Sequence, residues 1–164
     1  MTTIELLLEQ VRATSDQNGW FVTVGNGLRG LTAARAAWRA PGLDHSICET
    51  LAHLNYYNER HLKRLRGQPV EAAAAENNDT FQCVSNLSEE AWRAEAQRFA
   101  DIMANWCRYL EQRSAEGVAE TSGDDSSTWA SLVAHINLHN AYHCGQIVLI
   151  RKLQGSWDAA DGVS

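Results

Sequence analysis

Apolar residues recur every three or four positions along most of the chain, which is the period of an α-helix with one buried face. The segment from residue 3 to 15 places four such residues on one face: Ile4, Leu7, Leu8 and Val11. Asn18-Gly19 and three later glycines lower the helical propensity, although the apolar period continues to Leu31. We therefore expect a first helix that is kinked or interrupted.

The second predicted helix has a clear start and a clear end. Ser46 is followed three residues later by Glu49, and this pair can form a capping box in which each residue satisfies a backbone N–H of the other. Several cations then precede Gly67, as is typical of a helix C-terminus. These signals predict a helix over residues 46–66.

Two more helices are predicted in the second half of the chain. Residues 67–87 contain Pro69 and several polar residues, and they are too long for an ordinary connection between neighbouring helices. A helix is expected from Ser88 to about Arg113, with acidic residues in its first turn.

The last predicted helix follows an acidic segment over residues 116–125, for which we expect a solvated, mobile linker. It is expected to begin at Ser126 or Ser127 and to end at Gly155. The whole pattern predicts an all-α protein, a four-helix bundle with a long crossover between helices two and three, in a single domain over residues 1–164.

Composition and charge exclude some classes of partner. The net charge is −6 and the pI about 5.5, which is the wrong sign for binding nucleic acid. No apolar run approaches the roughly 18 residues that span a bilayer. The N-terminus MTTIELLLEQ lacks the basic region and cleavage pattern of a signal peptide, so we expect a cytoplasmic protein that does not bind membranes.

The cysteines show no metal-binding or redox motif. They lie far apart, without CxxC spacing, at Cys48, Cys83, Cys107 and Cys144. We therefore expect reduced thiols.

Histidines supply the strongest chemical signal. His135, His139 and His143 fall at i, i+4 and i+8 within one predicted helix, on the stripe that also carries its buried apolar residues. Buried imidazoles need partners for both ring nitrogens, and a divalent cation meets part of that need. Two histidines four residues apart on a helix can bind one ion, as in the HExxH motif.

A third ligand from another helix would complete such a site, and the residues alone leave it open. His45 precedes the capping box and is disfavoured, whereas His53 and His61 lie within the second predicted helix. The apolar stripe of this helix slightly favours His61.

Two stretches of the chain resemble the DinB-like superfamily of four-helix metal-binding proteins. They are HSICETLAHLNYYNERHL (45–62) and LVAHINLHNAYHCGQIVLIRKLQGSW (132–157), with LAH, HNAYHCGQI and LQGSW as the most specific parts. The resemblance implies metal ligands at His53, His139 and His143, in place of His61. His135 would then be a core histidine or one that orients a ligand or a bound molecule.

The resemblance also implies a homodimer and a divalent metal cofactor, with zinc or nickel as the first candidates and iron as another. Relatives include thiol S-transferases that use bacillithiol or mycothiol. This sequence departs from the usual pattern at two positions: Cys144 stands where an arginine is common, and Cys48 where a tryptophan is frequent. The electrostatics and packing beside the site are expected to differ accordingly.

Three neutral imidazoles would leave a metal ion with an open position, which favours catalysis. We expect a metal-dependent thiol S-transferase acting on a small molecule together with a low-molecular-weight thiol. A metal-dependent hydrolase is one alternative, with Glu49 as the nearest candidate base, although its capping role takes precedence. A non-catalytic metal-binding or stress-response protein is the other.

No catalytic residue is assigned from the sequence. Five polar residues could line a pocket near the ion, but such residues on helices more often serve packing: Asn55, Tyr57, Asn137, Tyr142 and Gln146.

Overall fold

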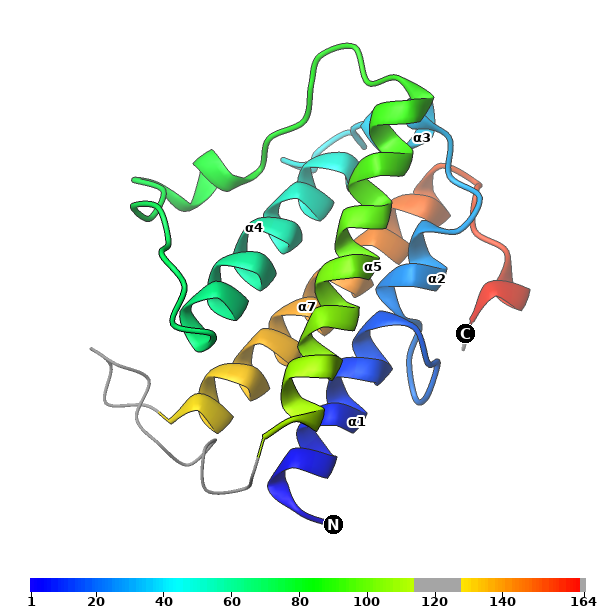
Figure 1. Ribbon diagram of the computed structural model, residues 1–164. Coiled ribbons are helices and arrows are strands. Elements are labelled where there is room, and N and C mark those ends of the chain that lie inside the picture. Colours follow the sequence, from blue (N-terminus) through cyan, green and yellow to red (C-terminus); the bar gives the residue numbers. More distant parts are fainter. Residues whose placement is uncertain (114–127, 163–164) are drawn as a thin grey trace.

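Four long helices form a bundle in the computed structural model, which describes residues 1–113 and 128–162 (Figure 1). They are α1 (Thr3–Ser15), α4 (Ile47–Leu65), α5 (Glu89–Glu111) and α7 (Trp129–Leu153). α5 and α7 each pack against both α1 and α4, so the four helices surround a common core. The predicted all-α fold is confirmed.

Hydroxyl side chains begin each long helix. Thr2, Ser46, Ser88 and Thr128 each accept a hydrogen bond from a backbone N–H in the first turn. The predicted capping box of α4 is present: the Ser46 N–H donates to Glu49 Oε2 at 2.7 Å, and the Glu49 N–H donates to Ser46 Oγ at 3.3 Å. α4 therefore begins where the sequence predicted.

The first predicted helix is interrupted, as expected. α1 ends at Ser15, and the short helices α2 (Val24–Leu28) and α3 (Ala33–Ala37) follow. Thr23 and Thr32 have extended backbones and cap the helices that follow them. The apolar period continues across these breaks because all three helices bury residues in the same core.

The crossover between α4 and α5 is present and carries one short 3₁₀ helix, η1 (Asn77–Thr80), which packs against α4. α4 and α5 run in the same direction, so the chain has to return along the length of the bundle between them (Figure 1). This return brings the crossover over the outer side of α4.

The start of the last long helix differs slightly from the prediction. α7 begins at Trp129, after the cap Thr128, rather than at Ser126 or Ser127. The acidic segment 116–125 lies outside the described residues.

Large apolar side chains from all four long helices fill the centre of the bundle. Trp106 and Phe99 of α5, Leu54 of α4 and Ile147 of α7 are almost completely buried. None of the helices in the described part of the chain combines the length and apolarity needed to cross a bilayer.

The expectation that all cysteines are reduced is wrong for one pair. Cys48, in the first turn of α4, and Cys83, on the crossover, form a disulfide with a Cα–Cα distance of 5.9 Å. The two residues are 35 positions apart and meet only because the crossover passes over α4. Cys107 and Cys144 are free thiols.

Candidate metal centre

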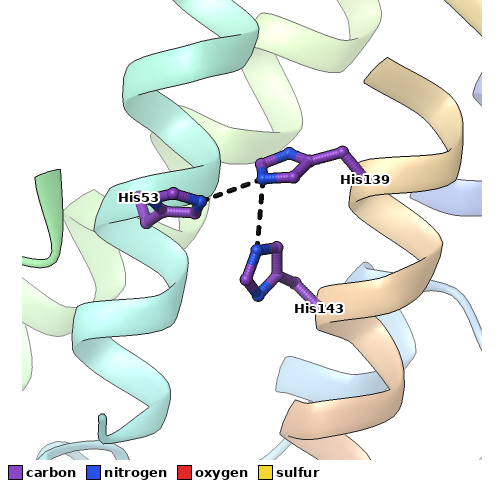
Figure 2. A group of neighbouring side chains, drawn as sticks. All are labelled: His53, His139 and His143. Atoms are coloured by element: carbon purple, nitrogen blue, oxygen red, sulfur yellow. Dashed lines mark hydrogen bonds between the residues drawn. The ribbon is translucent and has the colours of Figure 1, made fainter. Parts of the chain in front are cut away.

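Three histidine side chains from two helices converge between α4 and α7 (Figure 2). His53 extends from the middle of α4, and His139 and His143 extend from successive turns of α7. His53 and His143 are buried, and His139 is partly buried.

The three Nε2 atoms face one another. Nε2 of His139 lies 2.9 Å from Nε2 of His53 and 3.1 Å from Nε2 of His143. Two imidazole nitrogens that bind one zinc-type ion at about 2.0–2.1 Å lie about 3.4 Å apart at the tetrahedral angle and about 2.9 Å apart at a right angle, so the observed distances lie at the lower end of this range. The spacing of the nitrogens therefore suits a shared cation.

The opposite ring nitrogens fix the orientation of two of the histidines. Thr80 Oγ1 donates to the carbonyl oxygen of Asn77 at 2.6 Å, so it accepts the hydrogen bond from Nδ1–H of His53, also at 2.6 Å. Nδ1–H of His143 donates to Oε1 of Gln146 at 2.6 Å. In both rings the lone pair is then on Nε2, directed into the centre.

The third ring cannot satisfy both of these lone pairs. His139 has one ring proton when neutral, so its Nε2 can donate to His53 or to His143 but not to both. Within the described part of the chain, its Nδ1 is buried without a hydrogen-bond partner. A divalent cation would accept all three Nε2 lone pairs and would remove this deficit.

Burial keeps the three rings neutral. It lowers the pKa of His53 to about 3 and that of His139 to about 4, with neighbouring histidines adding to the effect. Burial also lowers the pKa of His143, despite the opposing hydrogen bond to Gln146. Neutral imidazole is the form that binds metal, so at neutral pH no proton has to be displaced from Nε2 of His53 or His143.

The other histidines lie outside this group. His135 is exposed, and the ring of His61 stacks on Tyr57 with a centroid distance of 6.1 Å. His45 stacks on Phe81 instead. Of the two candidates that the sequence left open on the second predicted helix, His53 is the one that meets the α7 pair.

One family of known proteins matches this chain. The family described as the DinB superfamily matches residues 26–147, which include all three converging histidines. The chain belongs to the DinB superfamily. No curated protein and no solved structure matches it.

An aromatic ring from the crossover covers one side of this DinB-superfamily centre. Phe81 stacks on His53 with a centroid distance of 3.9 Å, and its other face contacts His45 at 3.8 Å. The edge of the Tyr57 ring also meets His53. Neither Thr80 nor Phe81 was found from the sequence, because nothing in a long polar loop indicates which helix it contacts.

Two cysteines lie on the helices that carry the centre of this DinB-superfamily chain, Cys48 on α4 and Cys144 on α7. Cys144 follows His143, but its Sγ donates to the carbonyl oxygen of Val22 at 2.9 Å. Burial raises the pKa of this thiol to about 12, so it stays protonated and is a poor nucleophile. Cys48 forms the disulfide with Cys83.

Glu49, the candidate base, is already engaged. Its Oε2 accepts from the Ser46 N–H, and its Oε1 pairs with Arg39. Burial would raise the pKa of Glu49, but the bonds to Ser46 and electrostatic interactions with Arg39 and His45 lower it overall. A carboxylate with a lowered pKa that is held by a helix cap is poorly suited to take a proton from water.

Proposed function

We propose that this chain binds one divalent transition-metal ion through Nε2 of His53, His139 and His143 and uses it in an enzymatic reaction. The observation that carries the proposal is the convergence of three neutral imidazoles. Nε2 of His53 and Nε2 of His143 each direct a lone pair into the centre, and the single ring proton of His139 can bond to only one of them. Membership of the DinB superfamily supports the same conclusion.

Three neutral ligands suit an open, catalytic site. A closed structural site has four protein ligands, whereas the group formed by the described residues contains only three histidines. When bound in such a site, the ion would lower the pKa of coordinated water toward about 7, or ionise a coordinated thiol. The imidazole donor set is compatible with zinc, nickel and iron, and we propose zinc or nickel first.

Among the possible reactions we favour thiol S-transfer. A low-molecular-weight thiol that is ionised at the centre needs no protein carboxylate as base, and the nearest candidate, Glu49, is held by Ser46 and Arg39. The second substrate would be a small electrophile. A hydrolase remains the alternative, and it would require a base from another residue or from a second molecule.

A non-catalytic metal-binding protein is the second candidate class. It would be favoured by a fourth protein ligand that closes the site, with His61 and His135 as the residues to test. Neither belongs to the converging group, and this favours the open site.

Elemental analysis of purified variants tests the metal ligands. We expect His53→Ala, His139→Ala and His143→Ala each to lose stoichiometric metal, because two remaining imidazoles bind a divalent ion far more weakly than three. His61→Ala and His45→Ala serve as matched controls and should retain it. Loss of metal in His61→Ala together with retention in His53→Ala would show that the ligand set is wrong.

An activity screen separates the classes of reaction. The metal-loaded protein is assayed with low-molecular-weight thiols plus electrophiles, and in parallel with ester and amide substrates. We expect turnover in the thiol panel and loss of turnover in His139→Ala. Turnover with esters or amides alone would favour the hydrolase, and no turnover in either panel would favour the non-catalytic protein.

A further inference from the structure

Residues 77–83 of the crossover form one wall of the histidine centre. Thr80 is buried and holds Nδ1 of His53, and Phe81 covers the face of the same ring. Most of the crossover before this segment is exposed. The segment therefore contributes to the centre mainly through His53, the member of the group that α4 supplies, and Phe81 also makes an edge contact with the ring of His143 at a centroid distance of 6.0 Å.

The Cys48–Cys83 disulfide is the covalent attachment of this segment to α4. Cys83 lies two residues after Phe81, and Cys48 lies five residues before His53. Hydrogen bonds also join the preceding part of the crossover to α4: Tyr57 Oη donates to Asn77 Oδ1 at an exposed position, Tyr56 Oη accepts from the Ala74 N–H, and Arg60 Nη1 donates to the carbonyl oxygen of Glu71. Without the disulfide, no covalent bond among the described residues would hold Thr80 and Phe81 against α4, and their position would depend on hydrogen bonds and ring contacts.

The two sulfurs differ in how easily a thiol can reach them. Cys48 is 3% exposed, whereas Cys83 is only partly buried, so Cys83 is the sulfur that an incoming thiolate can attack. Cys48 is the second residue of α4, where the unpaired backbone N–H groups of the first helical turn stabilise negative charge. This position stabilises the thiolate that would leave.

We propose that the Cys48–Cys83 pair is a thiol–disulfide exchange site through which a low-molecular-weight thiol weakens metal retention by the histidine centre. This inference rests on the proposed metal site.

The exchange is balanced by two molecules of the small thiol. The first attacks Sγ of Cys83 as a thiolate and forms a mixed disulfide; the bond between the two cysteines breaks, its electron pair goes to Sγ of Cys48, and Cys48 takes up a proton. The second attacks the mixed disulfide, which releases the small-molecule disulfide and leaves Cys83 as a thiol. Two electrons and two protons pass from the small thiol to the protein.

Reduction would act on the metal through His53. Once residues 77–83 separate from α4, Nδ1 of His53 loses the acceptor that fixes its tautomer, and the ring loses the cover of Phe81. Loss of such a partner of a metal-binding histidine costs about 10–100-fold in metal affinity. We expect a change of that size between the oxidised and reduced proteins.

Titration of the full chain with Co²⁺ alone, followed by its visible absorption, tests this inference. One sample is oxidised with glutathione disulfide, and the other is reduced with a phosphine that is then removed under anaerobic conditions. Alkylation and mass spectrometry count the free thiols in each sample, and circular dichroism checks that the helices persist. We expect two free thiols and tight binding in the oxidised protein, and four free thiols and about 10–100-fold weaker binding in the reduced protein.

Variants test whether the disulfide changes the metal affinity through Thr80 and His53. Cys48→Ala/Cys83→Ala should bind Co²⁺ like the reduced protein under both conditions, and Cys107→Ala, which leaves the disulfide intact, should keep the full redox response. Thr80→Val, which keeps the shape of the side chain but removes its hydroxyl, should weaken binding in the oxidised protein, and Thr80→Ser should restore it.

Three results would overturn the inference, and they differ in their meaning for the centre. Equal Co²⁺ affinity in the two redox states, or four free thiols after oxidation, would contradict the exchange site and leave the metal site intact. No Co²⁺ binding in either state would contradict the metal site itself, and the inference with it.

Discussion

At the scale of single residues, the centre depends on which atom of each side chain carries a proton. His53 is held from both ends: Thr80 fixes Nδ1–H, and Nε2 faces the other two rings. Gln146 does the same for His143. These two neutral acceptors orient the rings without adding charge to the centre, so a bound cation would keep its full positive charge.

Gln146 gives the first prediction at this scale. We expect Gln146→Met to lower the affinity for Co²⁺ or Zn²⁺ by about 10-fold or more, because methionine fills the same space without a strong acceptor for Nδ1–H of His143. Metal titration measures the effect. Gln97→Met is the control, because Gln97 bonds to Asp101 on the exposed side of α5. Unchanged affinity in Gln146→Met would show that His143 needs no orienting partner.

Glu59 gives a prediction of pH dependence. Its carboxylate pairs with Lys63 at 2.9 Å and with Arg98 of α5, which also contacts Glu95. The hydrogen bonds to Lys63 and Arg98 lower the pKa of Glu59 below 4.5, although burial opposes them. Because the pKa is lower in the folded state, the stabilisation is present above about pH 4.5 and is lost as the pH falls through the lowered value.

We therefore expect Glu59→Gln to lower the free energy of unfolding at pH 7 by about 0.5–1 kcal/mol, as is usual for partly exposed pairs. The difference from the parent protein should shrink below pH 4.5. Urea unfolding at several pH values measures it, with Glu71→Gln at an exposed position of the crossover as the control. A difference that does not change with pH would contradict the ion pair as its cause.

At the scale of elements, α4 and α7 are aligned by a buried pair of amides. Asn58 Nδ2 donates to Asn140 Oδ1 at 2.7 Å, and Asn140 Nδ2 donates to Asn58 Oδ1 at 3.1 Å. Both residues are fully buried. The two bonds exist only when the helices have one axial alignment, and Asn140 directly follows His139. The pair therefore fixes the axial position of α4 relative to α7, and with it the position of His53 relative to His139 and His143.

Replacing one member of this pair should cost more than replacing both. We expect Asn58→Leu or Asn140→Leu to lower the free energy of unfolding by about 1–3 kcal/mol, because the remaining amide stays buried without its partner. The double variant should recover part of that loss in stability but should bind metal more weakly than the parent. Urea unfolding and metal titration of the parent protein, the two single variants and the double variant form a double-mutant cycle. Additive losses of stability would show that the two amides act independently.

At the scale of the whole molecule, α7 has apolar side chains on the side that faces away from the bundle. The helix carries no charged residue from Trp129 to Ile150. Four large side chains are about half exposed or more on this helix: Leu138, Tyr142, Leu149 and Leu153. They recur at spacings of four and seven, with Gly145 between them, which is the spacing of a helix–helix interface. We propose that this face contacts α7 of a second copy and so forms the expected homodimer.

Charged substitutions on this face should separate the dimer. We expect Leu138→Glu and Leu149→Glu to shift the protein to monomers in sedimentation velocity while leaving the helical content unchanged. Leu6→Glu introduces the same charge at an exposed leucine of α1 and should remain dimeric. A parent protein that sediments as a monomer at every concentration tested would contradict the dimer.

Local features of the sequence determined the helices. The capping box of Ser46 and Glu49 and the glycine after α4 act through neighbouring backbone groups, so they could be recognised without knowledge of the fold. The i, i+4 spacing of His139 and His143 likewise places both rings on one side of a helix by geometry alone. These signals were sufficient for the helical class of the protein. The same spacing also joins His135 to His139, so the choice of His139 and His143, like that of His53, came from the resemblance to the DinB-like superfamily.

Contacts between distant segments were decided only by the tertiary structure. His53 and His61 lie near the same stripe of α4 but about 12 Å apart along its axis, and only the axial alignment of α4 with α7 determines which of them reaches His139. Thr80, Phe81 and the disulfide at Cys83 depend on the path of the crossover over α4. Helical periodicity describes one segment at a time, whereas these contacts depend on how separate segments pack.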